Sequence, residues 1–158
     1  MMSSKIAISM GGNIGCVEDN FHIAVEALCR AGISMINVSP VFSTAPVDCP
    51  PGTPDFHNAA LTACCTMAPL ELLDLCKQLE YAAGRPECYP RNAPRPLDLD
   101  IILYGDLVFE HDRLQIPHPR ALERRFVLEP LAAIAPEWIF PTTGLTVKQH
   151  FERLSMNR

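Results

Sequence analysis

Hydrophobic residues along the chain repeat with two different spacings, which separate predicted strands from predicted helices. Alternating or continuous apolar runs predict four strands, at 5–10, 33–44 with a kink near Pro40, 56–65 and 97–104, and allow a short one at 107–109. Apolar residues at helical spacing predict four helices, between Glu18 and Gly32, between Pro69 and Gly84, over 120–135 and over 146–154.

The order of the first six of these elements is typical of an α+β protein with a ferredoxin-like βαββαβ sandwich. We expect an antiparallel sheet with the helices packed on one face. The other face is expected to stay free for two long proline-rich segments, 46–54 and 85–96. A length of 158 residues predicts a single domain over residues 1–158 with a core of its own.

Two carboxylates interrupt the apolar strand at 97–104. Asp98 and Asp100 are two residues apart, so their side chains share one face, with alpha carbons roughly 6–7 Å apart. The core face is expected to carry Leu97, Leu99, Ile101 and Leu103. Two buried like charges are unfavourable unless one takes a proton or a cation lies between them. Oxygen ligands of this kind suit Mg²⁺, particularly beside a substrate phosphate. The alternative is a solvated strand end.

Composition narrows the class of protein. A mean hydropathy of +0.10 is that of an ordinary globular chain, no apolar run reaches the roughly 20 residues of a membrane span, and no secretory segment is apparent. We therefore expect a cytoplasmic protein. A net charge of -5 argues against nucleic-acid binding. Seven cysteines without a CxxC pair favour neither zinc nor disulfides, and Cys29 and Cys76 are expected on buried helix faces.

Arginine is unevenly distributed. Seven of the thirteen basic residues are arginines between Arg85 and Arg125, around the two aspartates, and the guanidinium group matches phosphate oxygens well. His118 stands between two prolines just after the aspartate strand, which favours a phosphate-donor role. A scatter of solvated surface arginines and a structural histidine are the alternatives.

Other motifs are weaker. The glycines at 11–15 fit neither GxGxxG nor GxxxxGK[ST] and predict a tight strand-to-helix turn rather than a phosphate cradle. Zinc-protease and serine-hydrolase motifs are absent. Phe56 and Asn58 share one face of their strand, where an aromatic ring and an amide suit a flat heterocycle, although such a phenylalanine is more often a core residue.

Several of these segments together resemble one known family. The stretch from Asn92 to Ile102 resembles the signature of 6-hydroxymethyl-7,8-dihydropterin pyrophosphokinase, a folate-pathway enzyme with a ferredoxin-like fold. Further similar segments lie in the same order along nearly the whole chain, at 8–15, 43–46, 56–60, 79–85, 116–120 and 124–131.

The resemblance implies a role for each matching position. It implies two Mg²⁺ ions on the ATP phosphates held by Asp98 and Asp100, which with Arg85 and Arg95 would form the catalytic set. It implies an ATP site that includes His118, Arg124, Arg95, Lys77, Glu80 and Ile101. It implies a pterin between Phe56 and Phe126, its edge recognised by Asn58 and by Thr44, Ala45 and Val47.

The chain departs from the family pattern at four positions. Lys77 replaces a glutamine found in some relatives, and Gly12 stands where many have serine. Asn92 occupies a position that is tryptophan in some members, and Pro119 replaces a tyrosine seen elsewhere. None of these changes affects the two carboxylates.

The implied reaction transfers the β,γ-pyrophosphoryl group of ATP to the pterin hydroxymethyl oxygen and releases AMP. The expected partners are these two small molecules, with no nucleic acid and no membrane, and the chain is expected to be a monomer. Two other hypotheses stay open. One is a different Mg²⁺-dependent phosphotransferase or nucleotidyltransferase that uses the same aspartates. The other is a ferredoxin-like binding module without chemistry.

Overall fold

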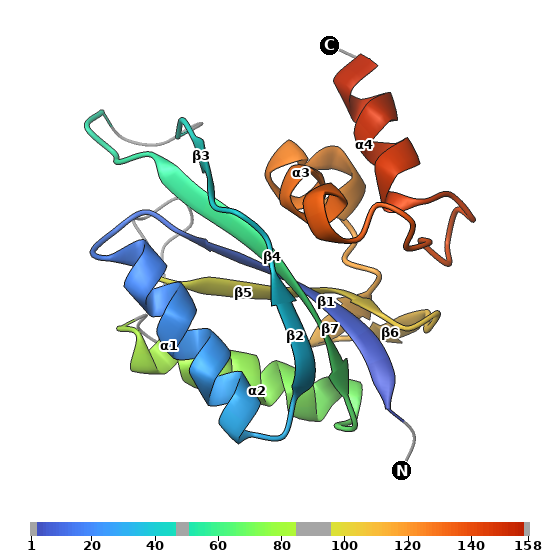
Figure 1. Cartoon of the computed structure of the whole chain (residues 1–158), viewed down its shortest axis with the longest axis horizontal. Helices are drawn as coiled ribbons and strands as arrows, with labels where there is room; N and C mark the ends of the chain where they lie inside the picture. The colour runs from blue at the N-terminus through green and yellow to red at the C-terminus, as the bar shows by residue number, and fades with distance from the viewer. Residues whose placement is uncertain (1–2, 47–50, 85–95, 157–158) are drawn as a thin grey trace.

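A computed structural model of the chain describes residues 3–46, 51–84 and 96–156 (Figure 1). The elements, in chain order, are β1 (Ser4–Gly12), α1 (Val17–Arg30), β2 (Ser34–Val38), β3 (Phe42–Thr44), β4 (Phe56–Cys65), α2 (Pro69–Ala82), β5 (Asp98–Tyr104), β6 (Phe109–His111), β7 (Leu114–Ile116), the 3-10 helix η1 (Ala121–Glu123), α3 (Arg125–Ile134) and α4 (Val147–Met156).

The main sheet is antiparallel and has five strands. Its strand order is β2-β4-β1-β5, and β3 pairs with β4 beyond the end of β2. Strands β6 and β7 form a separate hairpin. The chain is therefore a mixed protein of helices and antiparallel strands, as expected.

One face of the main sheet carries α1 and α2 (Figure 1). Alternate residues of β1 point into this first core because successive strand residues face opposite sides. The first core also takes alternate residues of β5 and the apolar stripes of both helices. Its members include Ile6, Ile8, Met10, Phe21, Leu28, Leu72, Cys76, Leu97, Leu99 and Ile101. The expected helices on this face are confirmed.

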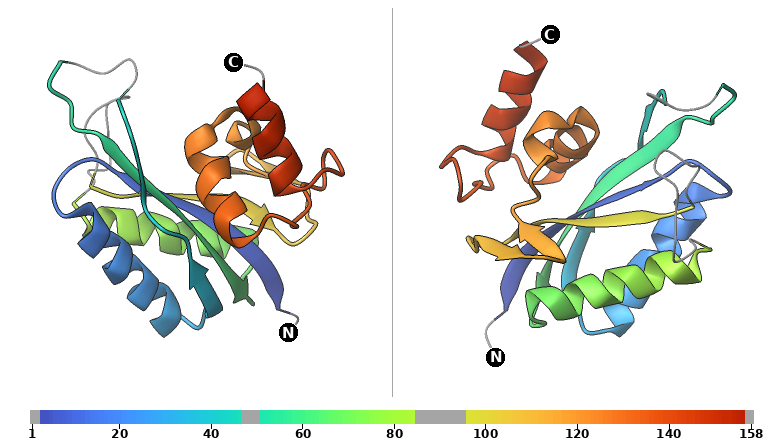
Figure 2. Two further views of the ribbon diagram at one scale, coloured as in Figure 1. Left: turned by 45° about the horizontal axis from the view of Figure 1, so that its top comes forward. Right: turned by 180° about the vertical axis from the view of Figure 1, so that it is seen from behind.

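The opposite face is not free, and that expectation was wrong over part of the sheet. Helices α3 and α4 lie on it, on the far side from α1 and α2 (Figure 2). Their second core includes Ala7, Ala60, Ile102, Val127, Leu131, Phe140 and Val147. The small side chains of Ala7 and Ala60 let α3 approach the sheet closely, so both strands are buried on two faces.

A bulge in β5 changes the assignment of Leu103. Ala7 pairs with Leu103 but Ile8 pairs with Ile101, so Ile102 is an extra residue opposite β1. One extra residue reverses the alternation of side chains. Leu103 therefore lies in the second core with Ile102, and not in the first core, where it was expected.

Several boundaries also differ from the sequence prediction. The strand expected at 33–44 is two strands separated at Pro40, the strand allowed at 107–109 is part of the β6–β7 hairpin, and the helix expected at 120–135 begins with the turn η1. Cys29 is exposed, contrary to expectation, whereas Cys76 is buried. Among the described helices, none is long and apolar enough to cross a membrane.

Candidate active site

The two aspartates lie on the second face of the sheet, in register with residues of β1 and β4. Asp98 pairs with Gly11, which pairs on its other side with Asn58. Directly opposed residues of antiparallel strands point to the same face, so the carboxylate of Asp98 and the amide of Asn58 lie in one row across three strands. Asp100 begins the next row, opposite Ser9. Both aspartates are half-buried.

Glycine at position 11 keeps the middle of this row free of a side chain. A Cβ built on Gly11 would lie 3.2 Å from Oδ1 of Asn58. The sheet surface between Asn58 and Asp98 is therefore bare backbone, the shape that lets a flat ligand lie close to the strand. The sequence assigned Gly11 only to a turn. The structure extends β1 to Gly12, so Gly11 lies inside the strand, beyond the end predicted at residue 10.

Asn58 offers a buried hydrogen-bonding group to this surface. Its side chain is buried, with the residue 3% exposed, and its Nδ2 donates to Oγ1 of Thr44 at 3.1 Å. Its Oδ1 makes no hydrogen bond to the described residues. A buried acceptor of this kind costs free energy unless a ligand supplies the donor. Thr44 itself pairs with Phe56 across β3 and β4, which places Phe56 on the same face.

Phe126 and Arg124 lie at the start of α3, on the same face of the sheet as the aspartates. Phe126 lies in the first turn of α3, which packs against β4, and the guanidinium carbon of Arg124 lies 5.5 Å from the centre of the Phe126 ring. Phe126 is 37% exposed, unlike the core residues of α3. An aromatic ring left exposed beside a cation is available to contact a ligand.

His118 lies close to Asp100 and Arg124. Its backbone N–H donates to the carbonyl of Ile102 at 3.1 Å, and its Nδ1 accepts the backbone N–H of Arg120 at 3.2 Å. Burial lowers the pKa of His118 below its ordinary value; Asp100 opposes this shift and Arg124 and Arg120 add to it. The neutral ring, with Nδ1 accepting, carries its proton on Nε2 and can donate it to a phosphate oxygen.

Glu80 was expected near the nucleotide, and the structure places it on the backbone of β5. Glu80 is 2% exposed, and its Oε2 accepts the N–H of Leu99, between the two aspartates, at 2.7 Å. Its Oε1 lies 3.4 Å from Nζ of Lys77, whose side chain is exposed. Ile101 is buried in the first core, so a contact between this residue and a nucleotide would use its backbone on the edge strand.

Three of the expected site residues, Arg85, Arg95 and Val47, lie outside the described residues, as does Asn92. Ala45 is exposed on the segment that follows β3. The residues brought together on the second face are therefore Asp98, Asp100, Asn58, Thr44, Phe56, Phe126, His118 and Arg124.

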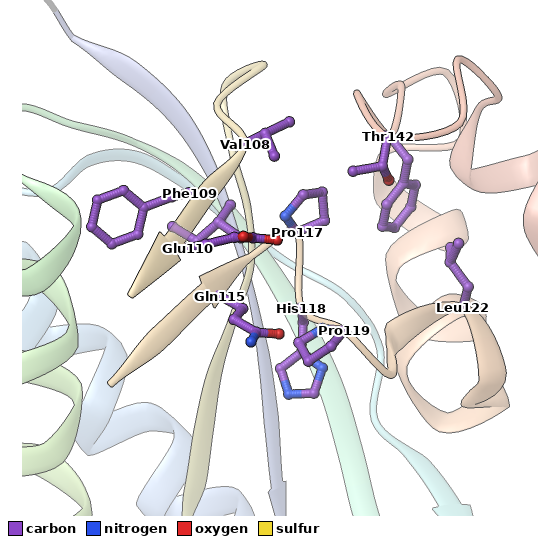
Figure 3. Close-up of a pocket in the computed structure, with 11 residues that line it drawn as sticks. Val108, Phe109, Glu110, Gln115, Pro117, His118, Pro119, Leu122 and Thr142 are labelled. Carbon is purple, nitrogen blue, oxygen red and sulfur yellow. The ribbon is translucent and has the colours of Figure 1, made fainter. Parts of the chain in front are cut away.

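A cavity of about 260 Å³ lies next to this site but does not contain the aspartates (Figure 3). Residues of the β6–β7 hairpin and His118 line one side, and Leu122 and Thr142 line the other. His118 is thus shared by the cavity and the site. Neither Asn58 nor Asp98 lines this cavity.

Comparison with known proteins supports the family that the sequence segments resemble. The family model described as 7,8-dihydro-6-hydroxymethylpterin-pyrophosphokinase matches residues 7–136. The chain belongs to this family. The 2-amino-4-hydroxy-6-hydroxymethyldihydropteridine pyrophosphokinase of Synechocystis sp. is 40% identical over 148 residues, which are 93% of this chain and 74% of that protein. The family and the names of its members support pyrophosphokinase activity in folate biosynthesis, so the predicted enzyme class is confirmed.

Other similar proteins are longer than this chain. The mitochondrial folate synthesis bifunctional protein of Arabidopsis thaliana is 42% identical over 127 residues, 80% of this chain but 23% of that protein. The crystal structure of Plasmodium falciparum HPPK-DHPS with pteroate matches with a TM-score of 0.72 at 13% identity, over 96% of this chain and 42% of that chain. The structural match supports the fold. This pyrophosphokinase-family chain spans less than half of both of these proteins.

Proposed function

We propose that this chain transfers the β,γ-pyrophosphoryl group of ATP to the hydroxymethyl oxygen of 6-hydroxymethyl-7,8-dihydropterin and releases AMP, at the second face of the sheet. The row formed by Asp98, Gly11 and Asn58 is the observation that carries the proposal. It joins an oxygen ligand for a cation, a bare backbone surface and a buried amide within three adjacent strands. A pterin on this surface would bring its reacting arm toward the carboxylates.

The two aspartates fit Mg²⁺. Both are half-buried carboxylates on one face, and Mg²⁺ is commonly held by one or two carboxylates while water and substrate phosphates complete its coordination. Asp98 and Asp100 would therefore hold the two ions that the family resemblance implies. When bound, the ions would neutralise charge on the triphosphate and acidify the attacking hydroxyl group.

The phosphate-binding groups lie beside the aspartates. His118, neutral and protonated on Nε2, would donate to a phosphate oxygen, and Arg124 would add a charge-assisted hydrogen bond. We assign Arg85 and Arg95 to the same task. Attack of the hydroxymethyl oxygen on the β-phosphorus breaks the bond from that phosphorus to the oxygen shared with the α-phosphate; AMP leaves, and the hydroxyl proton passes to solvent. These donors stabilise the charge that grows on the β-phosphate oxygens.

The pterin ring would lie between Phe56 and Phe126 and present its edge to Asn58. The Oδ1 of Asn58, which has no hydrogen-bond partner among the described residues, would accept from an N–H of the ring, and the Thr44 hydroxyl holds the amide in place through Nδ2. We assign Ala45 and Val47 to backbone contacts with the same edge. The nucleotide would extend toward α2, where Lys77 is exposed and the backbone of Ile101 lies on the edge strand.

We further propose that the scaffold is a ferredoxin-like sandwich that forms one domain over residues 1–158. The strand order β2-β4-β1-β5 and the two helices on one face support this assignment. The chain would act in the cytoplasm as a monomer on two small-molecule substrates.

The product of the reaction tests the proposed function. The chain is incubated with ATP, Mg²⁺ and 6-hydroxymethyl-7,8-dihydropterin, and nucleotides are separated by chromatography. We expect AMP in a 1:1 ratio with the pterin diphosphate. Release of ADP or of free pyrophosphate would instead indicate another phosphotransferase or a nucleotidyltransferase. Binding of both substrates without turnover would indicate a binding module.

A further inference from the structure

Three elements meet at one backbone carbonyl, that of Pro96, two residues before Asp98. Asn20, in the first turns of α1, donates from its side-chain Nδ2 to this carbonyl at 3.1 Å. Gly12, the last residue of β1, lies against it as well, since a Cβ built on Gly12 would be only 2.7 Å from the oxygen. Such a distance is shorter than any contact a real Cβ makes. The Pro96 carbonyl therefore accepts a hydrogen bond from Asn20 and occupies space that a side chain at position 12 would fill.

The position of this carbonyl affects Asp98 because Pro96 lies only two residues before it, where the paired part of β5 begins. The pairing of β5 with β1 ends at Asp98 opposite Gly11, so Pro96 and Leu97 precede the paired part of the strand. On the other side of Asp98, the N–H of Leu99 is held by Glu80 of α2. Asp98 thus stands between two backbone groups that are held by side chains of two helices. Both helices lie on the face opposite to its carboxylate (Figure 1).

Helix α1 does not depend on Asn20 for its own packing. Its buried stripe consists of Val17, Phe21, Ala24 and Leu28, whereas Asn20 is half-buried beside that stripe. The hydrogen bond from Asn20 is accordingly aimed at the start of β5 rather than at the core. The mechanism has no other use for this amide, and the sequence offered no motif that singled it out.

We propose that Asn20 is a positioning residue for the reaction. By holding the Pro96 carbonyl in the space that Gly12 leaves, it fixes the backbone before Asp98 and so the location of the Asp98 carboxylate. A small displacement of such a ligand weakens binding and slows turnover. The inference rests on the proposed function of Asp98 as a ligand of the Mg²⁺ on ATP.

The test compares variants that disturb the carbonyl from two elements. Asn20→Asp keeps the shape of the side chain but replaces the donor with an acceptor, and Gly12→Ala places a methyl group against the same oxygen. His22→Ala is the matched control, because His22 is exposed on the same helix. Calorimetry measures binding of MgATP alone and of the pterin alone, and AMP release measures turnover at a series of Mg²⁺ concentrations.

We expect both variants to bind MgATP about tenfold more weakly and to need more Mg²⁺ for half-maximal rate, because a misplaced ligand loses much of its effect. Affinity for the pterin should stay within about twofold of the unchanged protein, since its binding groups lie on β3, β4 and α3. The His22→Ala control should match the unchanged protein. This split between the two substrates is what a merely structural role of Asn20 would not produce.

Three results would overturn the inference. MgATP binding and Mg²⁺ dependence could be unchanged in a folded Asn20→Asp variant. Affinity for both substrates could fall equally, together with the melting temperature. Alternatively, Asn20→Asp could fail to fold while Gly12→Ala is normal, and either result would make Asn20 structural. An Asp98→Ala variant distinguishes a failure of the proposed function from a failure of this inference alone. If that variant binds MgATP normally, the proposed site fails and the inference with it; if it loses binding while Asn20→Asp does not, the inference alone fails.

Discussion

Asn58 illustrates how a single residue can reveal a ligand site. It is nearly fully buried on the face that carries the aspartates, and one of its two polar atoms has no partner among the described residues. An unpaired buried acceptor costs roughly 1–3 kcal/mol, which a protein tolerates where a ligand later supplies the donor.

Substitution of Asn58 should therefore affect the pterin and spare ATP. We expect Asn58→Ala to weaken binding of the pterin at least tenfold, by losing a hydrogen bond of about 1–1.5 kcal/mol and the geometry it imposes. Binding of MgATP and the melting temperature should change little. Isothermal titration with each substrate alone measures this, with Ser43→Ala on the exposed side of β3 as the control. Unchanged affinity for the pterin would remove Asn58 from the site.

At the level of elements, β5 is an edge strand of the main sheet. The N–H of Leu99 in this strand donates to the carboxylate of Glu80 in α2. Glu80 was a sequence prediction for the nucleotide site, yet both of its oxygens contact protein groups. A buried carboxylate that accepts a backbone N–H contributes more than a neutral hydrogen bond. Glu80 thus connects the helix to the part of the strand that carries both aspartates.

Substitutions of Glu80 should show whether its hydrogen bond or its charge stabilises the fold. We expect Glu80→Ala to lower the free energy of unfolding by about 1–3 kcal/mol, because the Leu99 N–H loses its partner beside the core. Glu80→Gln retains an acceptor for that N–H and should recover most of the loss. Urea denaturation measures both variants. Equal destabilisation by Ala and Gln would mean that the charge, rather than the hydrogen bond to Leu99, is what matters.

The C-terminal helix contains a second histidine with a shifted pKa. His150 is buried in α4, its Nε2 lies 2.6 Å from Oγ1 of Thr143, and its ring meets the edge of Phe140. Burial lowers the pKa of His150, and the charge of Arg153 adds to that shift. Protonation therefore favours the unfolded chain, where the pKa is ordinary, about 6.5.

Stability should accordingly fall as the pH is lowered from about 6.5 to the depressed pKa of folded His150, and should change no further from this group below it. We expect a His150→Gln variant, whose amide can still reach Thr143, to show a smaller loss over the same interval. Thermal melts from pH 7.5 to 5 compare the two proteins. Parallel curves for both would show that His150 is not the group responsible.

At the scale of the whole molecule, the two faces of the sheet have different tasks. Helices α1 and α2 pack on the first face and α3 and α4 on part of the second, while β2 at the edge of the sheet stays mostly exposed. In the row from Asn58 to Asp98, Asn58 is buried and Asp98 half-buried, and Phe126 lies partly exposed at the start of α3. Because Asp98, Asp100 and Asn58 lie on paired strands, strand register fixes the separation of these three groups.

The sequence predicted much of this arrangement because alternation and helical spacing are local properties. The strand of Asp98 and Asp100, the shared face of Phe56 and Asn58 and both helices of the first layer follow from them. The second layer could not be predicted in the same way, since Ala7 and Ala60 are ordinary strand residues until α3 is known to lie over them. The bulge at Ile102 and the contact of Asn20 with Pro96 depend on distant partners that spacing along the chain does not show.

The most direct test of the account is the rate of AMP formation in two isosteric variants, Asp98→Asn and Asp100→Asn. Each removes a charge without changing shape at a half-buried site, so the fold should survive. Asp106→Asn is the matched control, an exposed aspartate in the turn after β5. We expect a loss of about 100-fold or more in kcat for each of the first two and none for the control, with melting temperatures preserved. Normal rates in both Asp98→Asn and Asp100→Asn would contradict the central claim.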